Sequence, residues 1–217
     1  MSNDVAVIDE SLTAKEIHAQ VQRIQQVMES VMKDGTHYGL IPGCGDKPTL
    51  LKAGAEKLMM TFRLAADPEV EDLSESGIRR YRVLTKITNQ STGMFLGTGV
   101  GECSSEEEKY AWKAAVSPEE YDSTDPSSRR LKYKYKGEPV PQVKMNPADV
   151  ANTILKMAKK RSLVDAILTV TAASDIFTQD IEDMPEGTVR QDNPVGAMKL
   201  PNYGHHKGQV MDDPAIP

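Results

Sequence analysis

The sequence predicts an α+β fold in which an antiparallel β-β-β meander packs on a long helix, with a helical segment before it and a flexible acidic tail after it. Two helical patterns precede a run of three strand-like segments, and one long helical pattern follows them. Strands that follow one another through short turns are typical of an antiparallel meander, because each hairpin reverses the chain direction. The length of 217 residues suits one domain with an arm or tail.

The first helical pattern lies near the N-terminus. Residues 1–11 are acidic and show no periodicity, so we expect a disordered terminus there. Residues 12–35 are expected to form the N-terminal helix, which Ser11 or Thr13 caps and Gly35 ends. Its buried face is predicted by apolar side chains that recur at helical spacing: Ile17, Val21, Ile24, Val27 or Met28, and Val31.

A stretch rich in glycine and proline, GLIPGCGDKPTLLKAGAEKL, spans residues 39–58. It differs from the phosphate-binding loop G-x-x-x-x-G-K-[ST], because a helix precedes it and Pro48, which has no N–H to offer an anion, follows Lys47. The dinucleotide fingerprint G-x-G-x-x-G is not completed either. We therefore expect a rigid turn made by Gly43 and Gly45 rather than a nucleotide site.

The second helix is expected to begin directly after this turn. It should run from about Leu50 to Phe62, with Thr49 as its cap. Lys47 and Lys52 would then lie near the N-terminus of the helix, which is a position suited to one phosphate contact.

Three strand-like segments follow the second helix. GIRRYRVLTKITNQ and GMFLGTGVGEC favour strands, and the NQSTG turn between them predicts a hairpin. PEVEDLSES, residues 68–76, is expected to supply the third strand. SSEEEKYAWKAA, residues 104–115, is expected to form a short helix that begins at a serine cap.

The last part of the chain combines an irregular segment, a long helix and a tail. Residues 117–145 contain four prolines and the DSTDPSS run, so we expect a long surface loop. The long helix is expected to begin at Asn146, a favoured capping residue, with Pro147 in its first position. It completes the expected core, residues 36–178. Residues 179–217 are acidic and punctuated by proline, and we expect a mobile tail.

Composition and motifs argue against an enzyme or a metal protein. The two cysteines lie outside any C-x-x-C and cannot supply a four-ligand zinc site, and H-E-x-x-H and G-x-S-x-G are absent. We therefore expect no catalytic residues, no metal and no cofactor. The sequence contains neither a signal peptide nor an apolar run of about 20 residues, so we expect a cytoplasmic protein without a membrane span.

Cations gather in clusters although the net charge is −6. Lys156, Lys159 and Lys160 share one face of the long helix, and Arg161 extends it. The expected loop interleaves cations with tyrosines, as a single-strand groove does for phosphates and bases. The other candidate DNA-binding residues are Arg129, Arg130, Lys132, Tyr133, Lys134 and Tyr135 in this loop, Arg79, Arg80 and Arg82 on the hairpin, and Lys47 and Lys52.

Three short motifs, in this order, carry a resemblance to a known family: KAGAEKLMMTF (52–62), GTGVGECSS (97–105) and ILKMAKKRSLVDAIL (154–168). Residues 36–177 resemble the single-strand annealing proteins of phages and mobile elements, which are related to the eukaryotic annealer of double-strand-break repair. The resemblance implies a β-β-β-α core, rings or helical filaments, single-stranded DNA in a basic groove and no nucleotide hydrolysis. It implies that Lys160 and Arg161 contact phosphates, whereas Val164 stands where the family has its next cation.

The resulting hypothesis is ATP-independent binding of single-stranded DNA and annealing of complementary strands, by a homo-oligomer, in phage or mobile-element recombination. Annealing needs no bond chemistry; it needs neutralised phosphates and exposed bases. The expected partners are single-stranded DNA, the annealed duplex intermediate, and a phage exonuclease or a host single-strand-binding protein. The alternative is a non-catalytic scaffold or accessory protein of a DNA-processing complex, whose basic faces are merely solvated.

Overall fold

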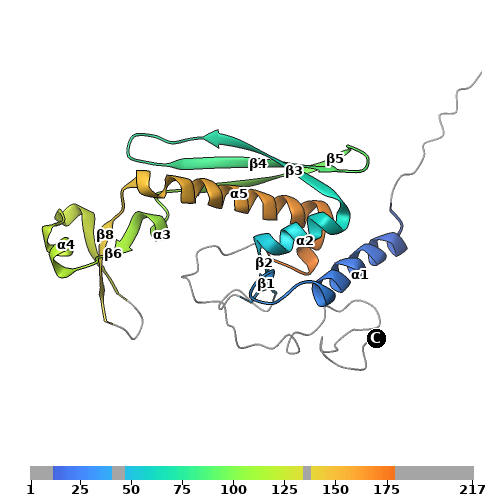
Figure 1. The fold of residues 1–217 in the computed structure, drawn as a ribbon, viewed down its shortest axis with the longest axis horizontal. Coiled ribbons are helices and arrows are strands. Elements are labelled where there is room, and N and C mark those ends of the chain that lie inside the picture. The colour runs from blue at the N-terminus through green and yellow to red at the C-terminus, as the bar shows by residue number, and fades with distance from the viewer. Residues whose placement is uncertain (1–11, 41–46, 134–137, 179–217) are drawn as a thin grey trace, which may run out of the picture.

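The fold is built on a three-stranded antiparallel sheet that packs against one long helix (Figure 1). The computed structural model describes residues 12–40, 47–133 and 138–178. The predicted α+β class, with an antiparallel meander on a long helix, is confirmed. The elements are α1 (Ala14–Ser30), β1 (Tyr38–Gly39), β2 (Thr49–Leu50), α2 (Lys52–Phe62), β3 (Leu64–Asp72), β4 (Arg80–Asn89), β5 (Phe95–Ser104), α3 (Glu108–Ala111), β6 (Trp112–Ala114), α4 (Pro118–Ser123), β7 (Arg129–Lys132), β8 (Val140–Lys144) and α5 (Pro147–Thr171), with 3-10 turns at Pro126–Ser128 and Ala173–Asp175.

Helix α1 is shorter than the predicted helix over 12–35. It begins after Thr13, which forms a reciprocal capping box with Glu16: each side chain accepts a hydrogen bond from the backbone N–H of the other residue. The helix stops at Ser30, and the chain then turns at Gly35, where φ is +72° and the N–H donates to the Tyr38 carbonyl. Of the predicted apolar stripe, Val21, Ile24 and Met28 are buried, whereas Ile17 and Val31, near the two ends of the helix, are about half exposed.

Helix α2 begins at Lys52, two residues later than predicted. Thr49 is not its cap: Thr49 lies in β2 and pairs with β1, and Leu51 occupies the N-cap position without a side-chain hydrogen bond. The Leu51 N–H instead donates to the His37 carbonyl. A Cβ at Gly54 would overlap the same carbonyl, so α2 needs a glycine where it crosses the chain at His37.

Strands β3, β4 and β5 pair in chain order, each antiparallel to its neighbour. The predicted hairpin is confirmed as β4–β5, and its turn contains Gly93, where φ is +69°. The third strand, β3, begins at Leu64, earlier than the segment predicted for it. Side chains alternate between the two faces of the sheet, so Val83, Thr85 and Ile87 of β4 all point toward α5 and are buried.

Helix α5 lies directly on the backbone of β5. Gly97, Gly99 and Gly101 face the helix from alternate positions of the strand. A Cβ at Gly99 would meet the Ser162 carbonyl oxygen at 2.5 Å, and a Cβ at Gly101 would meet the Ala158 carbonyl oxygen at 2.5 Å. The GTGVG motif therefore makes room for the helix. The helix presents small side chains at this contact: Ala158, Ser162 and Ala166.

Two side chains of α5 fix its position on the sheet through hydrogen bonds. The buried Ser162 hydroxyl lies 2.6 Å from the Thr85 hydroxyl and 3.0 Å from the Gly99 carbonyl oxygen. The Asp165 carboxylate accepts a hydrogen bond of 2.8 Å from the Val100 N–H. Since β5 is an edge strand of this sheet, Asp165 also satisfies a backbone donor at the open edge.

Two apolar clusters lie along α5. The larger packs α1 and α2 against the C-terminal half of α5, around the fully buried Ile24, Leu58, Ile167 and Phe177. Burial of each such aliphatic or aromatic side chain stabilises the fold by roughly 1.5–3 kcal/mol. The smaller cluster holds the N-terminal half of α5 against β4 and β5, and consists of Val83, Cys103, Tyr110, Val150, Ile154 and Ala158.

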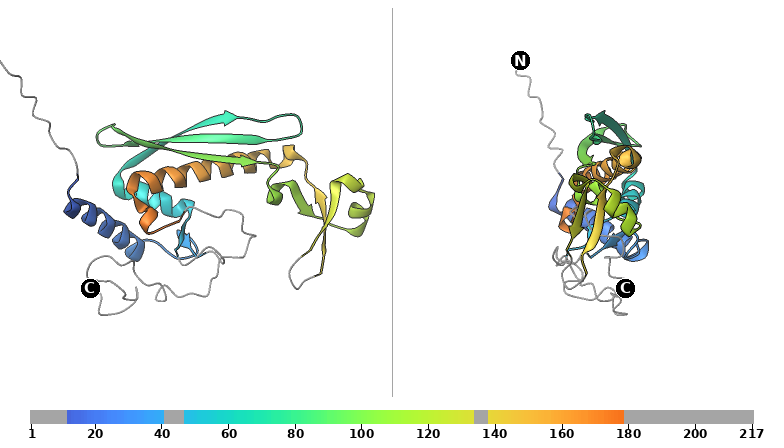
Figure 2. Two further views of the ribbon diagram at one scale, coloured as in Figure 1. Left: turned by 180° about the vertical axis from the view of Figure 1, so that it is seen from behind. Right: turned by 90° about the vertical axis from the view of Figure 1, so that its left-hand side faces the viewer.

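The prediction of a loop over 117–145 is wrong. Strands β6, β8 and β7, in that order, form a second antiparallel sheet beside the start of α5, and α4 packs on it (Figures 1 and 2). The prolines fit this structure. Pro118 occupies the first turn of α4, Pro126 opens a 3-10 turn, and Pro141 lies in β8 just beyond the last residue paired with β6.

The predicted helix over 104–115 is mostly wrong as well. Only Glu108–Ala111 is helical, and the chain enters β6 at Trp112. Glu107 occupies the N-cap position, and no serine side chain caps the helix.

Some predictions concern residues that the structure does not describe. They are the disordered terminus at 1–11, the turn glycines Gly43 and Gly45, the candidates Lys134 and Tyr135, and the acidic tail at 179–217. Within the described part of the chain, none of the helices has the length and apolar character needed to cross a membrane.

Candidate nucleic-acid interface

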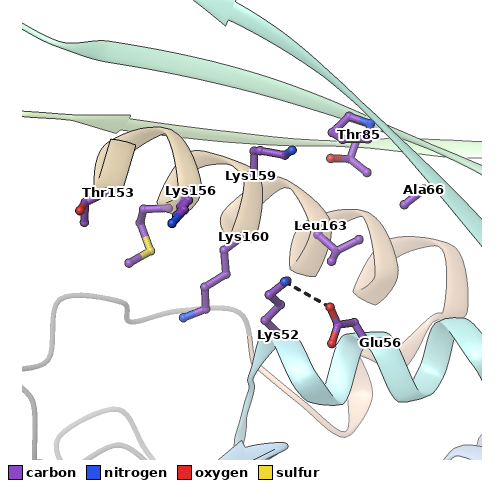
Figure 3. Close-up of a pocket in the computed structure, with 11 residues that line it drawn as sticks. Lys52, Glu56, Ala66, Thr85, Thr153, Lys156, Lys159, Lys160 and Leu163 are labelled. Atoms are coloured by element: carbon purple, nitrogen blue, oxygen red, sulfur yellow. Dashed lines mark ion pairs between the residues drawn. The ribbon is translucent and has the colours of Figure 1, made fainter. Parts of the chain in front are cut away.

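A groove runs beside α5 over the inner face of β3 (Figure 3). It forms because α5 packs on β5 and β4 and leaves most of β3 uncovered, so that Val70 on this face is 45 % exposed. The groove encloses about 680 Å³, and the first turns of α2 border it. Its lining residues are Lys52, Glu56, Ala66, Pro68, Thr85, Thr153, Lys156, Met157, Lys159, Lys160 and Leu163.

Four lysines give the groove its positive charge. Lys156 lies one turn before the adjacent Lys159 and Lys160 on α5, and Lys52 is the first residue of α2. Lys52 pairs with Glu56 at 3.2 Å, one turn further along α2. Lys156 and Lys159 form no ion pair with any residue in the ranges that the structure describes. The described lining residues include four lysines and one glutamate, which is a formal net charge of +3.

The groove also has an apolar part, to which both the sheet and α5 contribute. Ala66 and Pro68 of β3 and Met157 and Leu163 of α5 form most of it. Lysine ammonium groups bind phosphates as point charges, and an apolar surface accepts the faces of unpaired bases. None of the described lining residues is aromatic, so the groove lacks the rings on which bases most often stack.

Arg80 and Arg82 of the hairpin lie on the opposite face of the sheet from α5. Arg80 pairs with Glu102 at 2.8 Å, and Arg82 pairs with both Glu102 and Glu71. Arg79, just before β4, uses its guanidinium to donate to the Ile78 carbonyl. The structure therefore does not bring these predicted residues to the lysine groove, and acidic side chains already surround two of them.

Arg161 does not line the groove either. Its guanidinium forms a two-pronged ion pair with the Glu107 carboxylate, at 2.7 and 2.8 Å, and donates to the Glu102 carbonyl at 2.6 Å. The two charged side chains are only 22 % and 26 % exposed. Burial by itself would raise the pKa of Glu107, but the hydrogen bonds from Arg161 and from the Ser104 N–H outweigh it and hold that pKa below its usual value. Arg161 therefore ties α5 to the start of α3.

The Cys103 thiol lies next to this ion pair and is not bonded in a disulfide. Burial raises the pKa of this thiol to about 12, and the nearby Glu107 carboxylate acts in the same direction. A thiol with such a pKa stays protonated near neutral pH and is a poor nucleophile, so Cys103 serves packing.

Replacing Arg161 with methionine is expected to lower the free energy of unfolding by about 2 kcal/mol at pH 7, because Glu107 keeps its charge in a half-buried site without a partner. The pair holds the pKa of folded Glu107 below the ordinary value of 4.5. Its stabilisation is therefore complete above pH 4.5 and disappears as the pH falls through the folded-state pKa. Urea unfolding of Arg161→Met and wild type should differ at pH 7 and converge in acid.

Lys159→Met is the matched control for this experiment, since it removes a cation from an exposed position two residues earlier on α5. It should leave the unfolding curve almost unchanged. An Arg161→Met curve that overlies wild type at pH 7 would mean that the ion pair contributes nothing to stability.

The basic segment around residue 130 forms part of the second sheet. The Arg129 guanidinium donates to the Tyr121 and Asp122 carbonyls and lies 5.0 Å from the centre of the Tyr121 ring, so Arg129 fastens α4 to β7. Arg130 and Lys132 project from the other face of the strand, and both pair with Glu108 of α3.

The remaining candidates are dispersed. Tyr133 follows β7 and is 76 % exposed. The Lys47 ammonium donates to the Ser174 carbonyl at 2.9 Å, just after the C-terminus of α5, and does not line the groove. Across the described residues, no cluster of three or more histidine, cysteine or acidic side chains could hold a metal ion.

Sequence reasoning missed several residues of these sites. Pro68, Met157 and Leu163 line the groove only because α5 leaves β3 uncovered, and no spacing in the sequence indicates that. Trp112 stacks against Arg130 in the second sheet. As the single tryptophan of the chain, Trp112 could have been chosen as a candidate from the sequence, but the segment around it was predicted to be helical.

Comparison of the chain with protein-family models, with curated proteins and with solved structures gave no match. The resemblance to single-strand annealing proteins therefore depends on the three short sequence motifs.

Proposed function

We propose that this protein binds single-stranded DNA along the lysine groove and anneals complementary strands without ATP hydrolysis. The observation that carries the proposal is the groove itself, with a formal net charge of +3 beside an apolar part that consists mainly of Ala66, Pro68, Met157 and Leu163. Lys156 and Lys159 lie on adjacent turns of one helix, so their ammonium groups suit consecutive phosphates of one strand.

The apolar part of the groove favours a single strand over a duplex. The bases of a duplex stack on one another and pair inward. Only phosphates would then face the lysines, and no base would contact the apolar side chains of the groove. A single strand has exposed base faces, and these gain from contact with apolar side chains. The described lining contains no arginine, asparagine or glutamine, which are the side chains that most often read base edges, and this suits binding without sequence preference.

Annealing requires more than one bound strand, and we include self-association in the proposal. A homo-oligomer would place several lysine grooves side by side and raise the local concentration of complementary strands. Within phage or mobile-element recombination, a nuclease would supply the single strands, and a host single-strand-binding protein would be the competing partner.

The second candidate is a non-catalytic scaffold or accessory protein with solvated basic faces. The outer face of the main sheet favours this view, because acidic neighbours neutralise its cations, as in the Lys86–Glu69 pair at 3.0 Å. The two functions differ in size and ligand. An annealing protein sediments as a large oligomer and binds single strands, whereas a scaffold of this kind does neither by itself.

Fluorescence polarisation with labelled single-stranded and double-stranded DNA, across a series of salt concentrations, tests the proposal. Each phosphate that a lysine neutralises contributes about 0.7 to the slope of log affinity against log salt for a single strand. Contacts by three or four lysines of the groove predict a slope of roughly −2 to −3. A flat salt response, or equal affinity for duplex DNA, would contradict single-strand binding in this groove.

A further inference from the structure

The second sheet carries a cluster of cations beside the only tryptophan of the chain. Trp112 of β6 lies opposite Lys144 of β8, and on the other side of β8 Arg130 and Lys132 of β7 lie opposite Gln142 and Val140. Residues that pair in this way, two apart along each strand, share one face of a sheet. We call this surface the Trp112 face and define it by Trp112, Arg130, Lys132 and Lys144.

Helix α4 does not cover the Trp112 face. It packs on the other face of the sheet, where Arg129 lies over Tyr121 and Lys113 pairs with Glu120 at 2.7 Å. Figure 2 shows α4 at the outer end of the molecule and α3 between this sheet and α5. The element that contributes a charge to the Trp112 face is α3, through Glu108.

The side chains of the Trp112 face form a flat stack and an anion site. The Arg130 guanidinium lies 4.4 Å from the centre of the Trp112 ring, and its Nε donates to the Gln142 side chain, so its plane is held in place. One Glu108 carboxylate oxygen lies 2.7 Å from Arg130 and 3.0 Å from Lys132. All three charged side chains are accessible, at 32 % for Arg130, 45 % for Lys132 and 59 % for Glu108.

We propose that the Trp112 face is a second contact surface for single-stranded nucleic acid, and that the Glu108 carboxylate occupies the position of a phosphate there. The inference rests on the proposed function. An anion held between two cations marks a place where a phosphate oxygen fits equally well. A guanidinium plane stacked on an indole offers the flat cationic surface on which unpaired bases stack. With Glu108 displaced, the cations of Arg130, Lys132 and Lys144 all face the nucleic-acid strand.

The Trp112 face lies close enough to the lysine groove for one strand to reach both. Lys144, opposite Trp112, is followed by α5, which begins at Pro147, and Lys156 is nine residues further along this helix. These nine residues of helix span about 14 Å, and the three residue steps from Lys144 to Pro147 add at most about 10 Å. A strand that advances about 3.4 Å per nucleotide covers the combined distance, at most about 24 Å, in about seven nucleotides. Trp112 supplies the aromatic ring that the groove lacks.

Titration of the wild-type protein with oligothymidylate of about 20 nucleotides tests this directly, because Trp112 is the only tryptophan and its emission therefore reports this face. Emission should be quenched in step with the rise of fluorescence polarisation. A four-nucleotide oligothymidylate is too short to contact both surfaces at once and should quench less at saturation. Unchanged tryptophan emission when the longer oligonucleotide is bound would overturn the inference and leave the proposed function intact. Failure of wild type to bind any oligonucleotide would remove both.

Two substitutions test the roles of the side chains. Glu108→Gln should tighten single-strand binding about threefold at low salt and steepen the salt slope by about 0.7, because it frees two cations for a phosphate. Arg130→Lys keeps the charge but loses the planar stack, and should weaken binding about fivefold. Glu119→Gln on α4 removes the same charge from the covered side and should change neither quantity.

The direction of the Glu108→Gln effect separates the two roles of this carboxylate. If Glu108 only supports the fold, its loss weakens binding or leaves it unchanged, and either result overturns the inference. Thermal unfolding of each variant shows whether the sheet remains folded. The tryptophan titration of wild type gives a decision even if a variant does not fold.

Discussion

Replacing Lys156 and Lys159 together with alanine is expected to weaken single-strand binding by about 2 kcal/mol, roughly 30-fold at low salt. Both side chains border the groove, and neither forms an ion pair within the described residues, so their charges are available to phosphates. The slope of log affinity against log salt should become shallower by about 1.4, or 0.7 for each lost phosphate contact. Polarisation titrations across a salt series measure both quantities.

The matched control is Lys15→Ala with Lys86→Ala. It removes the same number of charges from α1 and from the outer face of the main sheet, where Lys86 pairs with Glu69. The control should bind single strands almost as wild type does. If both double variants lose affinity equally, the overall charge of the protein governs binding and the groove has no special role.

Placing a Cβ at Gly99 or Gly101 is expected to destabilise the protein by more than about 4 kcal/mol, and thus to remove most or all of its stability. Each new Cβ would overlap backbone atoms of α5: those of Ser162 and Ala166 for Gly99, and those of Ala158 and Ser162 for Gly101. Backbone atoms cannot move aside by changing a rotamer, so the helix would have to leave the sheet. Gly99→Ala and Gly101→Ala should show no cooperative thermal transition, or one at a much lower temperature.

Gly97→Ala provides an internal control on the same strand and face. Its Cβ would meet only the Val170 Cγ1, at 3.0 Å, and this methyl group belongs to a side chain that can move. A loss of about 1 kcal/mol is expected. Equal effects at Gly97 and Gly99 would mean that these glycines matter for strand conformation rather than for contact with the helix.

The helix and strand patterns identified the core because local signals and tertiary packing agree there. The Thr13 capping box, the Asn146–Pro147 start of α5 and the turn before Gly93 each act within a few residues, and each is present. The second sheet was missed because its strands are short and its prolines resemble loop punctuation. Pro141 is tolerated in β8 only because β6 ends before it, which depends on pairing between distant segments.

The lysines of the candidate site were predictable from helical spacing, but their surroundings were not. The i, i+3 and i+4 positions of Lys156, Lys159 and Lys160 already placed them together. The same reasoning joined Arg161 to them, because spacing alone cannot reveal that Glu107, far away in the sequence, binds this guanidinium. Likewise, the strand positions of Arg80 and Arg82 indicate alternation but not which face α5 covers.

The position of the second sheet in the chain affects how the protein folds. It is inserted between β5 and α5, which pack directly on each other, so residues 105–146 must be looped out before the core can form. Closing a flexible loop of that length has an entropic cost that a short connection avoids. Pairing of Trp112 with Lys144, and the hydrogen bond from the Met145 N–H to the Ala111 carbonyl, join the two ends of the insertion. Once the second sheet has formed, the remaining connection is short, and we therefore expect early folding of this sheet to accelerate docking of α5 onto β5.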